Sequence, residues 1–119
     1  MSTYIIDKNK VLSMIRGDSA NFSFNFTEGK FPNETPLIIG SNDIIFFGLM
    51  DPNQNFEHAL LKKEYSSKDF DSDGNFILSL DPDDTIELME GTYFYSIKLL
   101  TEDANIKTLV QNTRFNIIN

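Results

Sequence analysis

The run from Gly91 to Leu100 constrains the fold of this chain more than any other segment. Side chains alternate between the two faces of a β-strand, and here both faces carry large apolar groups. One face holds Tyr93, Tyr95, Ile97 and Leu99, and the other holds Phe94, Ser96, Lys98 and Leu100. We therefore predict a central strand that other parts of the chain cover on both sides.

The segment before this strand predicts a corner with one short helical turn. Pro82 pre-sets its own φ angle and cannot donate a hydrogen bond to a sheet. Four neighbouring side chains can cap a helical turn by bonding backbone N–H groups: Asp81, Asp83, Asp84 and Thr85. We expect Ile86, with either Leu88 or Met89, to pack this turn onto the core.

Other apolar patterns predict further strands over residues 11–15, 43–50 and 76–80, with a short edge strand over 35–38. The clearest alternation runs over residues 20–27, where Phe22, Phe24 and Phe26 should point into the core. Within 43–50, Gly48 suggests a β-bulge. The closing strand, over 106–118, should place these residues on one face: Leu109, Gln111, Thr113, Phe115 and Ile117.

Residues 57–65 are compatible with two structures. Their helix-forming residues favour a helix, whereas the tight turn before them favours a strand that pairs with 43–50, and we prefer the strand. The chain then has about seven or eight short antiparallel strands separated by turns. This spacing is typical of an all-β sandwich, here with a short helical turn before the penultimate strand.

The composition favours one domain and excludes several functions. A chain of 119 residues can bury a core, and we assign residues 1–10 to a leader or edge strand and 11–119 to the sandwich. The net charge of −8 opposes binding to nucleic acid or to anionic membranes. Without cysteine there are no disulfides, which fits synthesis in a reducing cytoplasm. No signal peptide or apolar membrane-spanning run is apparent.

One motif suggests a metal. Asp69, Asp71 and Asp73, followed by Gly74, match the first half of a calcium-binding loop. The last ligand position holds Leu80 rather than a glutamate, so we favour an ordinary turn and keep the three aspartates only as a weak calcium candidate. We expect no other cofactor. The single histidine, His58, lacks the partners that acid–base catalysis needs, so we predict that it lies on the surface and that the chain is not an enzyme.

The aromatic residues suggest either a core or a platform for stacking sugars. Strand alternation places most of them inward, which favours the core. Phe31, Phe56 and Phe70 lie in predicted loops and are candidates for contact with a partner. The leader residues Tyr4, Ile5 and Ile6 are further candidates, because they can pair with a sheet edge.

Several segments together carry a resemblance to a known family. They are Arg16-Gly17-Asp18 followed by Phe22, Phe24 and Phe26; Ile44-Ile45-Phe46 followed by 60–63; the corner 81–85 followed by the alternation over 91–99; and Phe115 with Ile117. These segments resemble the immunoglobulin-like N-terminal domain of upper baseplate proteins, from tailed phages of Gram-positive bacteria, and related small β-sandwich virion proteins. The resemblance covers about residues 11–118. It implies an immunoglobulin-like sandwich without catalytic residues.

Two functional expectations follow from the resemblance and the composition. The first is a structural virion protein of the tail, baseplate or neck, made in the bacterial host cytoplasm. Such a protein docks onto other virion proteins and onto itself as a homo-oligomer. The alternative is a carbohydrate-binding or adhesin-type β-sandwich on a cell surface, with calcium at Asp69, Asp71 and Asp73 as a further possibility. An enzyme is the least favoured class.

Overall fold

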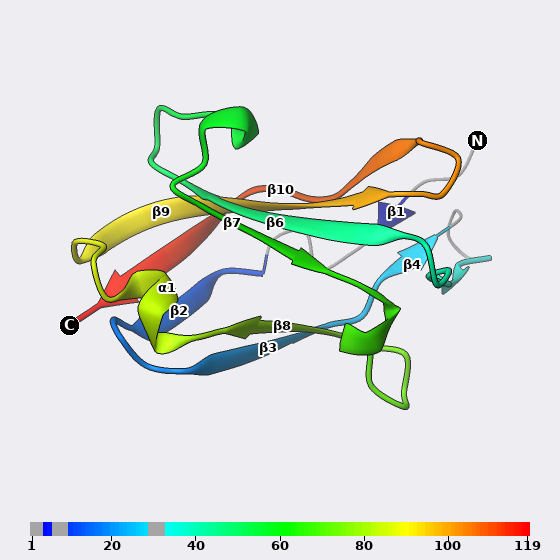
Figure 1. Ribbon diagram of the computed structural model, residues 1–119, viewed down its shortest axis with the longest axis horizontal. Coiled ribbons are helices and arrows are strands. Elements are labelled where there is room, and N and C mark those ends of the chain that lie inside the picture. The colour runs from blue at the N-terminus through cyan, green and yellow to red at the C-terminus, as the bar shows by residue number, and fades with distance from the viewer. Residues whose placement is uncertain (1–3, 6–9, 29–32) are drawn as a thin grey trace.

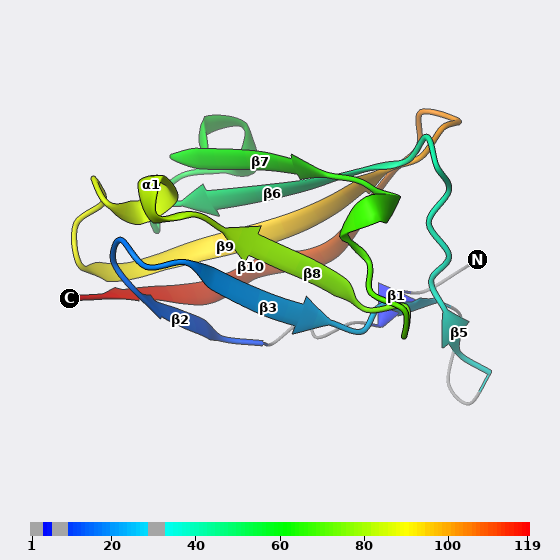
Figure 2. The ribbon, with the colours of Figure 1, turned by 60° about the horizontal axis from the view of Figure 1, so that its bottom comes forward.

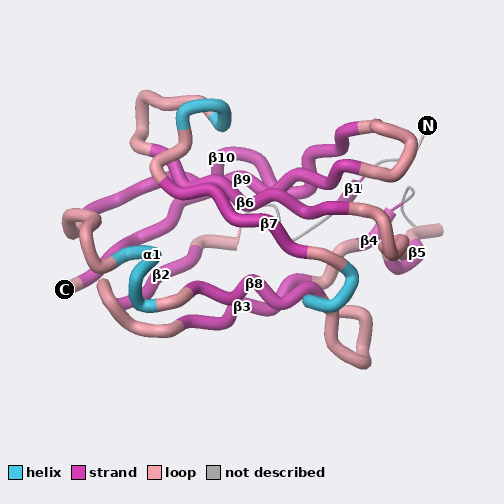
Figure 3. Tube along the Cα trace, in the orientation of Figure 1, coloured by secondary structure: helices cyan, strands magenta, loops and turns pink. Residues whose placement is uncertain are grey.

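A computed structural model describes residues 4–5, 10–28 and 33–119 and shows a mainly β protein (Figure 1). In these ranges, the longer strands are β2 (Leu12–Ile15), β3 (Ala20–Phe24), β6 (Ile44–Met50), β7 (Leu61–Tyr65), β8 (Phe76–Leu80), β9 (Gly91–Leu100) and β10 (Ile106–Ile118). The two-residue strands are β1 (Tyr4–Ile5), β4 (Thr27–Glu28) and β5 (Thr35–Pro36). The helical segments are η1 (Phe56–His58), η2 (Ser67–Asp69) and α1 (Pro82–Thr85). Figure 3 places these helical turns between strands.

The strands form a curled five-stranded sheet, in the order β2-β10-β9-β6-β7, that lies over the β3–β8 pair (Figures 1 and 2). A small third sheet has the order β1-β4-β5. β9 is central, between β10 and β6, as predicted. The prediction that all strands are antiparallel is wrong at β2, which runs parallel to β10 with Leu12 opposite Phe115. The large sheet is therefore mixed.

The core lies between the two layers and is rich in aromatic rings. Phe24 and Phe26 are buried as predicted, while Phe22 is half-buried at the edge of the core. Tyr95 is at the centre of the core, with ring centroids 5.9 Å from Phe47 and 6.0 Å from Phe115. Its hydroxyl donates a 2.6 Å hydrogen bond to the Lys10 carbonyl, so its one polar group is satisfied despite complete burial.

The corner contains α1 at the predicted place, before the penultimate strand. The prediction that Ile86 packs it onto the core is wrong: Ile86 is exposed, and so is Met89, whereas Thr85 is completely buried and Leu88 is half-buried against the core. Thr85 tolerates burial because its Oγ1 accepts a 2.9 Å hydrogen bond from the Gly17 N–H. Gly17, at φ +83°, forms the predicted turn after β2.

The closing strand is bulged, which corrects the predicted inward face. The β9–β10 register shifts on both sides of Val110, and Asn112 has a φ of +42°. Val110 is consequently buried next to Leu109, and Gln111 is turned out to solvent instead of into the core. The alternation predicted over 106–118 fails here because an extra residue in β10 reverses the side-chain order at each of the two register shifts. The second shift restores the order, so the other predicted inward residues are buried: Leu109, Thr113, Phe115 and Ile117.

Two expectations around β6 have different outcomes. The preferred strand over 57–65 is confirmed for β7, which pairs antiparallel with β6, although its first part is the turn η1. The bulge suggested at Gly48 is wrong, because β6 keeps an even register with both neighbours. Glycine is required there for another reason. A Cβ at Gly48 would lie 2.6 Å from the ring of Phe56.

The short edge strand predicted over 35–38 is present as β5, which is two residues long.

Candidate functional site

Two of the three aspartates of the calcium candidate, Asp69 and Asp71, bind the local backbone through their carboxylates. Asp69 Oδ2 accepts a 2.9 Å hydrogen bond from the Ser66 N–H and so caps η2. Asp71 Oδ1 accepts from the N–H groups of Asp73 and Asn75, which holds a tight turn. In the described ranges, no group of three acidic, histidine or cysteine residues is arranged to hold a metal ion.

The predicted partner-contact residues are dispersed. Tyr4 and Ile5 form β1, which pairs within the chain with β4, while Ile6 and Phe31 lie outside the described residues. Phe70 is half-buried, with its ring 5.5 Å from that of Phe76, and belongs to the rim of the core. Phe70 also lines a shallow hollow beside Leu37. Phe56 lies on the outer face of the large sheet and borders two adjoining hollows.

His58 is exposed at the end of η1, as predicted. The best-buried ion pair lies elsewhere, where Lys63 Nζ approaches Asp84 Oδ2 to 2.7 Å and thereby ties β7 to the corner. Beside it, the Tyr65 hydroxyl donates a 2.7 Å hydrogen bond to the Ser79 carbonyl. Burial, together with the charge of Asp84, raises the pKa of Tyr65 well above its ordinary value. These contacts connect two layers and leave a neutral tyrosine at physiological pH.

One end of the molecule carries a group of exposed apolar side chains, which we call the apolar end: Ile15, Ile86, Met89 and Ile118. Their exposed fractions are 52%, 49%, 79% and 44%. Ile15 lies opposite Ile118 in the β2–β10 pair, and Ile86 packs over the turn at Gly17. Figure 2 shows the β2–β3 turn, the loop after α1 and the C-terminus at this same end.

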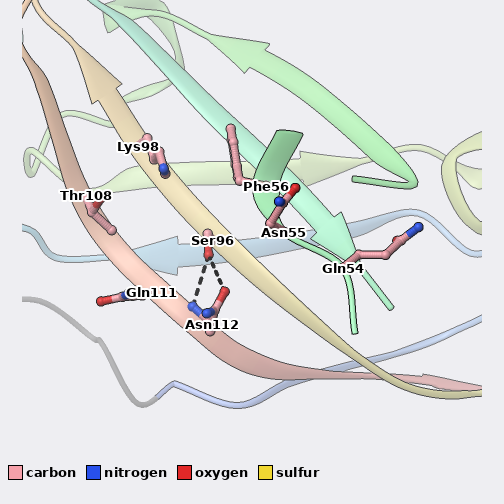
Figure 4. Close-up of a pocket in the computed structure, with 8 residues that line it drawn as sticks. All are labelled: Gln54, Asn55, Phe56, Ser96, Lys98, Thr108, Gln111 and Asn112. Atoms are coloured by element: carbon pink, nitrogen blue, oxygen red, sulfur yellow. Dashed lines mark hydrogen bonds between the residues drawn. The ribbon is translucent and has the colours of Figure 1, made fainter. Parts of the chain in front are cut away.

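The outer face of the large sheet carries a polar hollow of about 190 Å³ (Figure 4). We call it the amide hollow, and its wall includes Gln54, Asn55, Phe56, Ser96, Gln111 and Asn112. Lys98 also borders it, with Nζ 4.9 Å from the centroid of the Phe56 ring. Figure 4 shows Gln54 and Gln111 at opposite margins, with Ser96 and Asn112 between them.

A second groove of about 410 Å³ adjoins the amide hollow, because Phe56 and Lys98 line both. Its wall is more apolar, with Phe46 and the exposed Ile106, and its rim carries Glu57, Lys62 and Glu64. The outer face is therefore hollowed on both sides of Phe56.

The alternation along the strands gave no indication of the amide hollow. Gln111 was expected to face the core, and Ser96 and Asn112 meet only because of the bulge. The signal available was the polar pair Gln111-Asn112 directly after the apolar pair Leu109-Val110, which interrupts the alternation of the strand. No helix in the described part of the chain is long and apolar enough to cross a membrane. No protein-family model matches the chain, and no curated protein matches it either.

Proposed function

We propose that this chain is a non-enzymatic structural protein of a tailed-phage virion, built on an immunoglobulin-like sandwich and acting as a docking module. The apolar end is the observation that carries the proposal. Apolar side chains exposed together mark surfaces that a partner covers, and four large ones are exposed at this end of the molecule.

The rest of the molecule suits a passive role. Most of its aromatic rings are packed between the layers, around Tyr95 and Phe76. Burial raises the pKa of Tyr65 and of Tyr93, and the hydroxyls of both donate to carbonyl oxygens. Such tyrosines tie backbone segments together and are poorly placed to transfer protons. A rigid body with one apolar end is what docking onto a neighbouring subunit requires.

The segments that carry the family resemblance support the immunoglobulin-like part of the proposal. They form a turn at 16–18, a corner at 81–85 and the central strand β9, in a molecule of two packed layers. The mixed pairing of β2 with β10 is compatible with a sandwich whose first strand joins the sheet of its last strand.

Purified particles provide the test. In virions of a phage whose genome encodes this chain, among tail genes, mass spectrometry should detect the protein at a constant ratio to other tail proteins. Met89→Asp and Ile118→Asp should abolish incorporation while the isolated chain stays folded. Ile38→Asp is the matched control, because Ile38 is 84% exposed and is not part of the apolar end. Absence of the chain from clean particles overturns the proposal.

A further inference from the structure

The amide hollow has the features of a binding site that the proposed docking function does not use. Three of its carboxamide groups are held by hydrogen bonds within the chain. Gln54 Oε1 accepts from the Asp51 N–H at 3.1 Å, and Asn55 Oδ1 accepts from the His58 N–H at 3.3 Å. Asn112 Oδ1 accepts from the Ser96 hydroxyl at 3.2 Å. Backbone N–H groups can only donate, so they assign the carboxamide oxygens of Gln54 and Asn55 and direct the NH₂ groups elsewhere. At Asn112 the Ser96 hydroxyl already accepts from the Asn112 N–H and donates its own proton to Oδ1, which leaves the NH₂ group as a donor there too.

The bulge in β10 holds Asn112 in a conformation that a regular strand would not allow. Its φ of +42° lies in the left-handed region, and its own N–H donates a 3.0 Å hydrogen bond to the buried Ser96 Oγ. Ser96 thus contacts both the backbone and the side chain of Asn112. Non-glycine residues in this conformation are concentrated at functional sites, and bulges commonly redirect side chains beside such sites.

The wall of the hollow is also organised around Phe56. The absence of a Cβ at Gly48 lets the edge of the Phe56 ring approach the sheet, so the ring stands on the outer face without lying in the core. Lys98 is held beside this ring at 4.9 Å, and among the residues that line the hollow it alone carries a charge. An aromatic wall, several NH₂ donors and one ammonium group are therefore combined in one place.

This combination selects a ligand rich in hydrogen-bond acceptors, with one negative charge and an apolar face. Hydroxyl and ring oxygens of a sugar accept from the amide NH₂ groups, and the C–H face of the ring packs on an aromatic side chain. A carboxylate on the sugar complements Lys98 by a charge-assisted hydrogen bond. Glu57 and Glu64 line the adjoining groove together with Lys62 and Lys98, so the charges around the two hollows balance and do not by themselves repel an anion. Acidic residues farther away than about 8 Å oppose the attraction only weakly, because salt screens them at physiological ionic strength.

We propose that the amide hollow binds an acidic saccharide, with the sugar ring on Phe56, the carboxylate at Lys98 and the hydroxyls at Asn112 and its neighbouring amides. The adjoining groove beyond Phe56 accommodates the next unit of a longer glycan. The inference does not depend on the virion role, since a docking module and a cell-surface module both have use for a glycan contact.

The test compares two probes that differ at a single carbon, methyl β-D-glucuronide and methyl β-D-glucoside. Each is titrated into the ¹⁵N-labelled full chain while the side-chain NH₂ signals of Gln54, Asn55 and Asn112 are followed by NMR. We expect the glucuronide to shift these signals with a Kd on the order of a millimolar and the glucoside to bind about tenfold more weakly, a difference of about 1.4 kcal/mol. Equal binding of the two sugars, or no shift with either, overturns the proposal.

Two variants locate the interaction. Lys98→Met should remove the preference for the glucuronide and leave the weak glucoside binding. Asn112→Gly keeps the left-handed backbone, because glycine adopts it freely, and should weaken both sugars about tenfold. The matched control is Asn42→Ala, which removes an exposed asparagine hydrogen-bonded to Glu102, away from the hollow, and should change neither affinity.

The third probe is acetate, which carries a carboxylate but no sugar ring and so tests whether the ring is needed for binding. If acetate shifts the same NH₂ signals as strongly as the glucuronide, the hollow binds carboxylates in general and the saccharide assignment is wrong. If the glucuronide shifts signals at the apolar end instead, the location is wrong. Neither result bears on incorporation into virions, so failure here is distinguishable from failure of the docking role.

Discussion

The two faces of the large sheet come from the same strands and yet differ in almost every physical respect. On the inner face, Phe47 and Tyr95 are completely buried and contact each other. On the outer face, their neighbours Phe46 and Phe94 are half-buried, and two hollows lie beside Phe56. Close packing on one side therefore supports an outer side that is free to carry polar groups, a bulge and a redirected carboxamide.

The largest expected effect comes from truncating neighbouring residues on opposite faces of β6. Phe47→Ala removes a fully buried ring and should lower the free energy of unfolding by about 3–5 kcal/mol. Phe46→Ala removes a half-buried ring and should cost about 1 kcal/mol, because less apolar surface is returned to water. Urea denaturation of both variants measures the contrast. Equal losses would mean that the outer face is packed as tightly as the core.

The second effect concerns the close approach of Phe56 to the sheet. Gly48→Ala places a methyl group 2.6 Å from the Phe56 ring and should destabilise the fold by about 1–3 kcal/mol. If the clash is the cause, adding Phe56→Ala should recover most of that loss, which a double-mutant cycle would detect as coupling. Independent, additive losses would show that Gly48 is needed for a different reason.

A third effect is pH-dependent and tests the contact between the layers at Tyr65. The pKa of Tyr65 is raised above its ordinary value of 10 in the folded protein, so the unfolded chain loses its proton first as pH increases. The stabilisation by this tyrosine is therefore complete below pH 10 and falls as pH rises above that value. In chemical denaturation, Tyr65→Phe should cost about 1 kcal/mol at neutral pH through the lost Ser79 hydrogen bond, and it should reduce the decline above pH 10.

The smallest effect distinguishes two substitutions at the bulge. Asn112→Gly should lower the free energy of unfolding by about 1 kcal/mol through the lost Ser96 hydrogen bond. Asn112→Ala should lower it by about 1 kcal/mol more, since alanine also disfavours a φ of +42°. Thermal unfolding of the two variants side by side measures the free-energy cost of the positive φ for alanine, because both variants lack the carboxamide. If the alanine variant is as stable as the glycine variant, residue 112 can adopt a regular strand conformation and the positive φ is not required.

Periodic residues made much of the fold predictable. The alternation over 91–100 correctly indicated a central strand, and Phe24 and Phe26 are buried as their spacing required. The corner at Pro82 was predictable because proline favours the first helical turn and Asp84 accepts a hydrogen bond from the N–H of the nearby Asp81. In each case the determining interaction is local, or repeats with the period of a strand.

The features that escaped prediction depend on contacts between distant residues. Alternation is the same in parallel and antiparallel strands, so it carried no information about the pairing of β2 with β10. Burial of Thr85 instead of Ile86 depends on a hydrogen bond from Gly17, 68 residues earlier. The amide hollow depends on the bulge and on Ser96, which lies 16 residues before Asn112. Sequence periodicity does not report such pairs.

The parallel pairing of β2 with β10 also determines when the large sheet can close during synthesis. Ser13 and Asn116 contact each other across 103 positions of the chain. Until β10 has been synthesised, both β2 and β9 remain without the neighbour that lies between them. Closure of the large sheet must therefore wait for β10, and its rate should be limited by this long-range pairing.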